Sequence, residues 1–274
     1  MSRKRPWQLD MFRKGLKKNL RLKTLKQCLG DLGSDERCLL ITCGDNNGAM
    51  NYFLRELGGK WTWADLESQS IAEMSLLLGD PVHHAADEKL PFGDASFDRI
   101  VSIDVHEHVD EPGAITDEIQ RVASPGAQIV ITVPNGDESK LGVRIKHALK
   151  MTKEAYGHRR VGLTVDEVKS LMLGSRIEPR EVKTYSRFFT EMLELTINFL
   201  YVKVLSRKSD HDHDDHDHAE IAPATKDQLD SVSKSYRIYS LIFPVYWALS
   251  KLDWLLLGQE GYCVLVSGRK EAAV

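Results

Sequence analysis

The stretch that decides the fold is CLLITCGDNNG, residues 38–48, where a short apolar run gives way to glycine and small polar residues. The run at 38–43 predicts a buried strand, and the residues after the stretch, 49–57, predict a helix. Glycine and asparagine tolerate positive φ, so the turn between them can bring its backbone close to a ligand. In α/β sheets this first strand–turn–helix unit is where nucleotide-like ligands bind.

Similar units follow along the chain. Further strands are predicted at residues 60–64, 81–86, 99–104, 128–133, 177–185 and 261–267, and further helices at 69–78 and 113–123. Short strands that alternate with helices of about ten residues are typical of parallel sheets. The sequence therefore predicts an α/β fold with a Rossmann-like, doubly wound, mostly parallel sheet of seven strands.

The last two predicted strands are about 75 residues apart, which is too long for a simple loop. The predicted division is a basic arm at 1–30, a Rossmann-like domain at 31–186, a helical insert at 187–258 and the closing strand of the domain at 259–274. The insert contains apolar helix patterns at 188–205 and 236–257, the second expected to form a helix pair. Between them lies a loop rich in His and Asp, residues 209–220.

Composition narrows the class of protein. The chain has 274 residues, 42% hydrophobic and 28% charged, which excludes a wholly disordered, collagen-like or coiled-coil protein. Its four cysteines include no CxxC pair, so reduced thiols in a cytoplasmic protein are expected.

Several motifs occur in a characteristic order after the glycine turn. They are LPFGDASFDRIV at 90–101, VHEHV at 105–109, EIQRV at 118–122, SPGA at 124–127 and VITVP at 130–134. Together they resemble the class I S-adenosylmethionine-dependent methyltransferases, in the small-molecule branch of "methyltransferase type 11" proteins. The resemblance implies a methyltransferase whose cofactor is S-adenosylmethionine.

The resemblance also implies residue roles. It places at the cofactor Cys43, Gly44, Asp45, Asn46, Asp65, Leu66, Asp87 and Asp104. Gly44 would lie under the methionine moiety, and Asp87 beside the adenine amino group with Leu66 as an apolar neighbour. Asp65 follows the glycine turn by about 20 residues, a spacing at which an acid binds ribose hydroxyls.

Candidate catalytic residues are Asp104, His108 and His158, with Asp104 and His108 expected to line the reaction cleft. Methyl transfer is an in-line displacement, so a base is needed only where the nucleophile carries a proton of high pKa. Either histidine can serve as that base. No Asn/Asp-Pro-Pro-Tyr motif and no Pro-Cys pair occurs, so the acceptor is expected to be a small or lipid-linked metabolite rather than a nucleobase.

The glycine turn departs from the pattern of this family. Leu40, Thr42 and Asn46 replace the usual acid and two glycines, and the branched Thr42 is expected to narrow the approach to the cofactor. A non-catalytic cofactor-binding scaffold or membrane adaptor is therefore an alternative. A third reading, RNA methylation guided by the arm, is less favoured because no RNA-binding signature occurs.

The charge and the apolar spacing of the arm, and the apolar helix pattern of the insert, suggest contact with a membrane surface. Residues 1–30 hold ten Lys or Arg against one acid, and Leu9, Phe12, Leu16 and Leu20 recur at helical spacing. A basic amphipathic helix can lie in an anionic headgroup layer. We therefore expect residues 1–20 and 236–257 either to contact an anionic membrane peripherally, on its cytoplasmic side, or to pack on the protein's own body, as a docked helix and a helical cap. No functional metal site is expected, since the His/Asp tract resembles a solvated loop.

Overall fold

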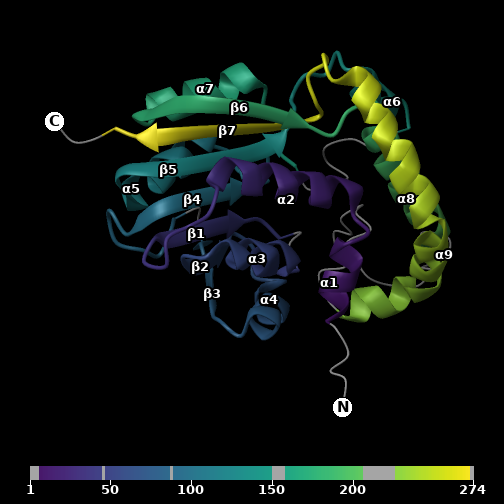
Figure 1. Cartoon of the computed structure of the whole chain (residues 1–274), viewed down its shortest axis with the longest axis horizontal. Coiled ribbons are helices and arrows are strands. Elements are labelled where there is room, and N and C mark those ends of the chain that lie inside the picture. Colours follow the sequence, from purple (N-terminus) through teal and green to yellow (C-terminus); the bar gives the residue numbers. More distant parts are fainter. Residues whose placement is uncertain (1–5, 45–46, 87–88, 150–157, 206–225, 272–274) are drawn as a thin grey trace.

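The computed structural model describes most of the chain. The described residues are 6–44, 47–86, 89–149, 158–205 and 226–271. They form one seven-stranded sheet with helices on both faces and a long helical arch at one side (Figure 1).

The sheet has the strand order β3-β2-β1-β4-β5-β7-β6. The strands are β1 (Arg37–Thr42), β2 (Lys60–Asp65), β3 (Val82–His84), β4 (Phe97–Ile103), β5 (Ala123–Pro134), β6 (Ile177–Tyr185) and β7 (Cys263–Lys270). The first five are parallel to one another, and β7 is antiparallel to its neighbours β5 and β6. The order reverses direction at β1, so the predicted doubly wound, mostly parallel sheet is confirmed.

Helices cover both faces because the central strands are buried almost throughout and their successive side chains point to opposite faces of the sheet. The helices are α1 (Trp7–Phe12), α2 (Leu16–Leu29), α3 (Ala49–Leu54), α4 (Ile71–Leu78), α5 (Pro112–Val122), α6 (Leu141–Ala148), α7 (Val165–Gly174), α8 (Phe188–Leu205) and α9 (Lys226–Ser250), with 3₁₀ turns η1 (Arg55–Leu57) and η4 (Lys251–Leu256). Leu39 and Ile41 of β1 pack with α5 and α7, whereas Leu40 packs with α1 to α4. One strand thus contributes to two separate cores.

The arm does not form the exposed amphipathic helix that the sequence predicts. Its Leu9, Phe12 and Leu16 are buried in the chain's own core, and the Phe12 ring lies 5.0 Å from that of Phe53 on α3. Of the two expectations for these side chains, packing on the protein's own body is therefore the one that this structure shows. The second half of the arm also packs on the domain, with Leu25 and Leu29 buried.

The insert forms an arch beside the sheet, with α8 and α9 packed together (Figure 1). The helix predicted at 188–205 is confirmed as α8. Residues 236–257 are not a helix pair: α9 continues through Pro244 as one helix and then tightens into η4. The His/Asp tract at 209–220 lies outside the described residues. None of the described helices combines the length and apolar character needed to cross a membrane.

Candidate cofactor and active site

The glycine turn leaves β1 at the carboxyl edge of the parallel strands. Gly44 has φ +66° and Gly48, which precedes α3, has φ +82°, conformations that favour glycine. A Cβ on Gly48 would also lie 3.3 Å from Leu77 and Met74, so this position needs glycine for space as well. Cys43 is buried beside the turn, and the predicted cofactor residues Asp45 and Asn46 lie outside the described residues.

Asp65, the predicted ribose-binding acid, ends β2 and is fully buried. Its Oδ1 accepts hydrogen bonds from the backbone N–H groups of Gly44 (2.8 Å) and Glu67 (2.9 Å), and its Oδ2 from the Thr42 hydroxyl (2.6 Å). Burial raises the pKa of Asp65 above its ordinary value, against the opposing effect of these donors. In this structure Asp65 ties the glycine turn to β2.

Thr42 affects the turn differently from the expectation. Its side chain is almost completely buried and directs its hydroxyl at Asp65 across the β1–β2 register, in which Thr42 and Asp65 are paired. Thr42 therefore acts on the glycine turn through Asp65, and its side chain does not itself obstruct a ligand that approaches the turn.

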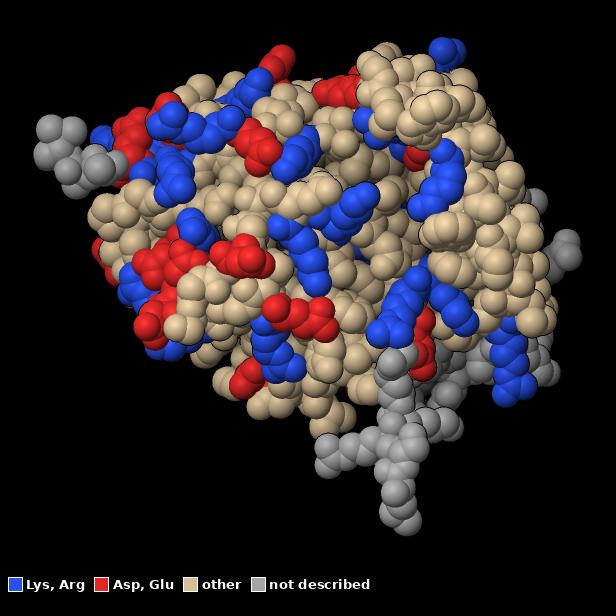
Figure 2. Space-filling model, in the orientation of Figure 1, with Lys and Arg blue, Asp and Glu red and all other residues tan. Residues whose placement is uncertain are grey.

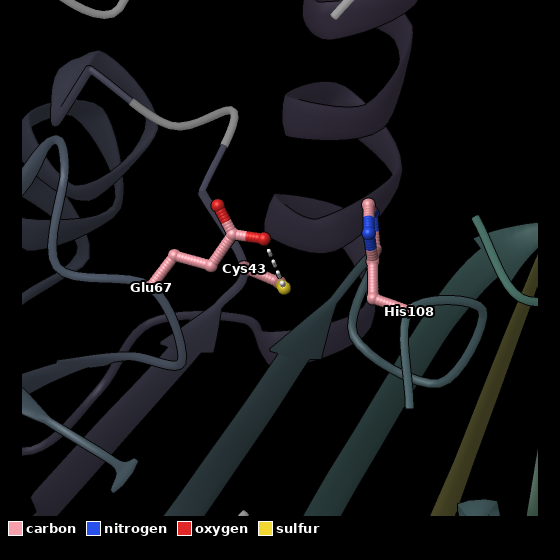
Figure 3. A group of neighbouring side chains, drawn as sticks. All are labelled: Cys43, Glu67 and His108. Atoms are coloured by element: carbon pink, nitrogen blue, oxygen red, sulfur yellow. Dashed lines mark hydrogen bonds between the residues drawn. The ribbon is translucent and has the colours of Figure 1, made fainter. Parts of the chain in front are cut away.

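Glu67 occupies the position over the glycine turn (Figure 3). A Cβ built on Gly44 would lie only 2.4 Å from the Glu67 Oε2, so the carboxylate rests directly against the Cα of that glycine. Its Oε1 lies 4.0 Å from the Cys43 Sγ. Glu67 is only half-buried, so unlike Asp65 it can be reached by a ligand. No motif in the sequence singles out this residue.

His108 approaches the same edge from the turn after β4, facing Cys43 and Glu67 (Figure 3). The ligand atoms of Cys43, Glu67 and His108 all lie within 4.8 Å of one another. His106, two residues earlier, points the other way: it is buried and its Nε2 lies 3.2 Å from the Thr116 hydroxyl on α5. Burial lowers the pKa of His106 to about 4.

The second predicted histidine, His158, lies beside the first although fifty positions separate them in the chain. The two ring centroids are 4.5 Å apart in an edge-to-face arrangement. The Arg159 N–H donates to the Glu107 carbonyl (2.8 Å) and draws this segment onto the turn after β4. The ligand atoms of Glu107, His108 and His158 form a second group within 4.8 Å, so His108 belongs to two groups whose donor types can also hold a metal ion.

Asp104 ends β4 with φ +49° and is 8% exposed. Its carboxylate forms an ion pair with Arg21, which comes from α2 of the arm. The Arg21 Nε also donates to the Tyr185 hydroxyl (2.9 Å), which lies 2.8 Å from the Thr132 hydroxyl. Burial opposes the charge of Arg21, but Asp104 outweighs it and holds the pKa of Arg21 well above its ordinary value. Sequence spacing gives no signal for this contact.

The predicted adenine side is only partly described. Leu66 is half-buried against the core, and its carbonyl lies 3.1 Å from the His84 Nε2 on β3. Asp87 lies outside the described residues. The carboxyl ends of β1, β2 and β4 thus bring together Gly44, Glu67 and His108, the place where ligands bind in open α/β sheets.

The comparisons agree with this geometry. A family model described as "Methyltransferase domain" matches residues 39–131, which include the glycine turn, Glu67 and His108. A search of curated proteins finds no match to the chain.

Solved structures share the fold at low sequence identity. A candidate methyltransferase from Bacillus halodurans is 15% identical with a TM-score of 0.56, covering 92% of this chain and 99% of its own. A candidate sarcosine dimethylglycine methyltransferase from Galdieria sulphuraria is 14% identical with a TM-score of 0.53, covering 92% and 84%. A geranyl diphosphate methyltransferase in complex with GPP and sinefungin is 12% identical with a TM-score of 0.51, covering 92% and 77%.

Proposed function

We propose that the chain is an S-adenosylmethionine-dependent methyltransferase that methylates a small or lipid-linked metabolite, on the cytoplasmic side of a membrane. The match of residues 39–131 to a methyltransferase domain model supports the reaction type. The observation that carries the placement of the reaction is the convergence of Gly44, Glu67 and His108 at one edge of the sheet. No other described part of the chain combines a bare glycine, a carboxylate and a histidine at the carboxyl ends of parallel strands.

The residues at this edge fit the cofactor. When bound, S-adenosylmethionine supplies an electrophilic methyl group on a positively charged sulfur. Gly44 has no side chain, so the group over its Cα is the Glu67 carboxylate, whose acceptor-only oxygens suit a ribose diol. Leu66 offers an apolar neighbour for adenine. We assign ribose binding to Glu67 in preference to Asp65, because the Asp65 oxygens already accept three hydrogen bonds and are buried.

His108 is the proposed general base, which takes a proton from the molecule that receives the methyl group. Its ring lies close to both Glu67 and His158, so a neutral imidazole nitrogen at this edge can take a proton from an attacking hydroxyl or amine. His158 sets the orientation of that ring by edge-to-face contact. Asp104 lies at the same edge of the sheet, and its charge is balanced by Arg21 of α2. We therefore assign it a supporting role, and the base is His108.

The test is calorimetric titration with S-adenosylhomocysteine. We expect Glu67→Gln to weaken binding about ten-fold or more through loss of a charge-assisted contact, with the melting temperature unchanged. Asp65→Asn should instead cost about 2 kcal/mol of unfolding free energy, because the neutral amide keeps one acceptor oxygen where three buried donors now reach a charged carboxylate. The matched control is Glu178→Gln, an exposed acid at the opposite edge of the sheet, which should change neither.

Two results would contradict the proposal. If Asp65→Asn abolished binding in a normally stable protein while Glu67→Gln bound normally, the ribose acid would be Asp65. If the folded wild type bound no S-adenosylhomocysteine, the scaffold or adaptor alternative would replace the enzyme.

A further inference from the structure

The outer surface of α9 and η4 is unusually apolar. Of fifteen large hydrophobic side chains exposed in the described residues, ten lie between residues 238 and 257. Leu241 is 81% exposed and Trp254 71%. We call these exposed side chains the α9–η4 face. Figure 2 shows the surface over α8 and α9 as largely tan, with basic side chains at its margins. Monomeric soluble proteins rarely expose such a concentration without a partner.

The α9–η4 face is held in place by contacts on its inner side. Asp253 of η4 accepts hydrogen bonds from the backbone N–H groups of Arg187 (2.9 Å) and Phe189 (2.9 Å) at the start of α8. The Tyr239 hydroxyl donates to the Lys14 carbonyl between α1 and α2. These contacts fix which side of the helix faces outward, so the exposure is a property of the fold.

Charge decides what kind of surface fits this face. Asp253 is the only acid between residues 236 and 257, and it is turned inward toward α8. The two cations of the segment, Arg237 and Lys251, are both exposed, and the Lys251 ammonium lies 4.4 Å from the centre of the Trp247 ring. The outward surface is therefore apolar and positive. Tryptophan and lysine together are typical of the boundary between headgroups and acyl chains.

We infer that the α9–η4 face docks the protein onto an anionic phospholipid bilayer. A second copy of the chain fits less well, because a symmetric contact through this face would bring its cations together without an opposing acid. The inference rests on the proposed function in one respect: a docked enzyme can meet a lipid-linked acceptor without extracting it from the bilayer. It also replaces the arm as the apolar anchor, since the apolar side chains of α1 are buried.

Flotation with vesicles tests the inference without turnover. The wild type should bind vesicles made of equal parts phosphatidylcholine and phosphatidylglycerol, and bind vesicles of phosphatidylcholine alone more weakly. Leu241→Glu should lower binding at least about ten-fold, because an apolar contact is replaced by a charge that anionic lipid repels. The matched control is Leu76→Glu on α4, where the leucine is also 81% exposed; it should bind as the wild type does.

Three outcomes would overturn the inference. They are no vesicle binding by the wild type, equal loss in Leu241→Glu and Leu76→Glu, and a wild-type dimer in sedimentation that Leu241→Glu converts to a monomer. A melting temperature equal to that of the wild type shows that the fold of each variant is intact. Failure of the proposed function would appear as lost cofactor binding with docking retained, so the two failures are distinguishable.

Discussion

The ion pair between Arg21 and Asp104 links the N-terminal arm to the carboxyl end of β4. Replacing Arg21 measures how much this ion pair stabilises the fold. Arg21→Met keeps most of the length and apolar stem of the side chain while removing the guanidinium. The side chains of Arg21 and Asp104 are only 11% and 12% exposed. The substitution therefore leaves a largely buried carboxylate without its partner, and it also removes the donor to the Tyr185 hydroxyl.

The expected cost follows from this geometry. Breaking a buried pair on one side destabilises a protein by about 3–5 kcal/mol, and we expect the lower end, about 3 kcal/mol, because both side chains retain slight exposure. In a chain of this size that corresponds to a fall in melting temperature of roughly 6–12 °C. Asp104→Asn suits the positive φ of this position, so the double variant Arg21→Met with Asp104→Asn should recover much of the loss.

Chemical denaturation of the two single variants and the double variant completes a cycle. The control is Arg180→Met, which breaks the exposed pair of Arg180 with Glu178 and should cost less than about 1 kcal/mol. A loss in Arg21→Met no larger than in this control would refute the reasoning, as would additive losses in the double variant.

Two buried titratable groups predict the response to acid. The pKa of His106 is lowered to about 4 by burial, so the unfolded chain binds a proton first and stability should fall as pH drops from about 6.5 to 4. His106→Gln should flatten that slope in a pH series of urea denaturation, whereas the exposed His83→Gln should leave it intact. Burial raises the pKa of Glu191, but Lys146 and Lys17 outweigh it and lower that pKa to about 2. Stability from this acid is present above about pH 4.5 and lost toward pH 2. Glu191→Gln should cost about 2 kcal/mol at neutral pH and remove that acid-side loss; an unchanged midpoint at neutral pH would contradict the assignment.

Sequence patterns predicted the sheet well because strand burial is a local property. The run at 38–43 and the helix at 188–205 appear nearly as expected. The arm was predicted less well. Helical spacing identifies Leu9, Phe12 and Leu16 as one apolar stripe, but the same stripe fits a membrane or the protein's own core. Only the tertiary contact with α3 decides between them.

The site was predicted at the level of its edge and its histidines. His108 and His158 were predicted separately, and their rings meet at this edge. Glu67 and Arg21 were missed for different reasons. Glu67 lies two residues beyond the expected acid, where local spacing cannot tell which carboxylate faces the ligand. Arg21 reaches the edge from a helix far away in sequence, and no periodicity encodes that contact.

The departure at Thr42 and the position of Glu67 are connected through the register of the sheet. Thr42 pairs with Asp65 in the β1–β2 ladder, so a threonine in place of the usual glycine sets a hydroxyl directly beside that carboxylate. The hydroxyl and two backbone N–H groups then hold Asp65 in the interior. If Glu67 binds the ribose, as proposed, the acid has moved outward by two residues as the glycine was lost. The divergent turn is then one coupled change that preserves an accessible carboxylate, and divergence at Thr42 alone is no argument for a scaffold without a cofactor.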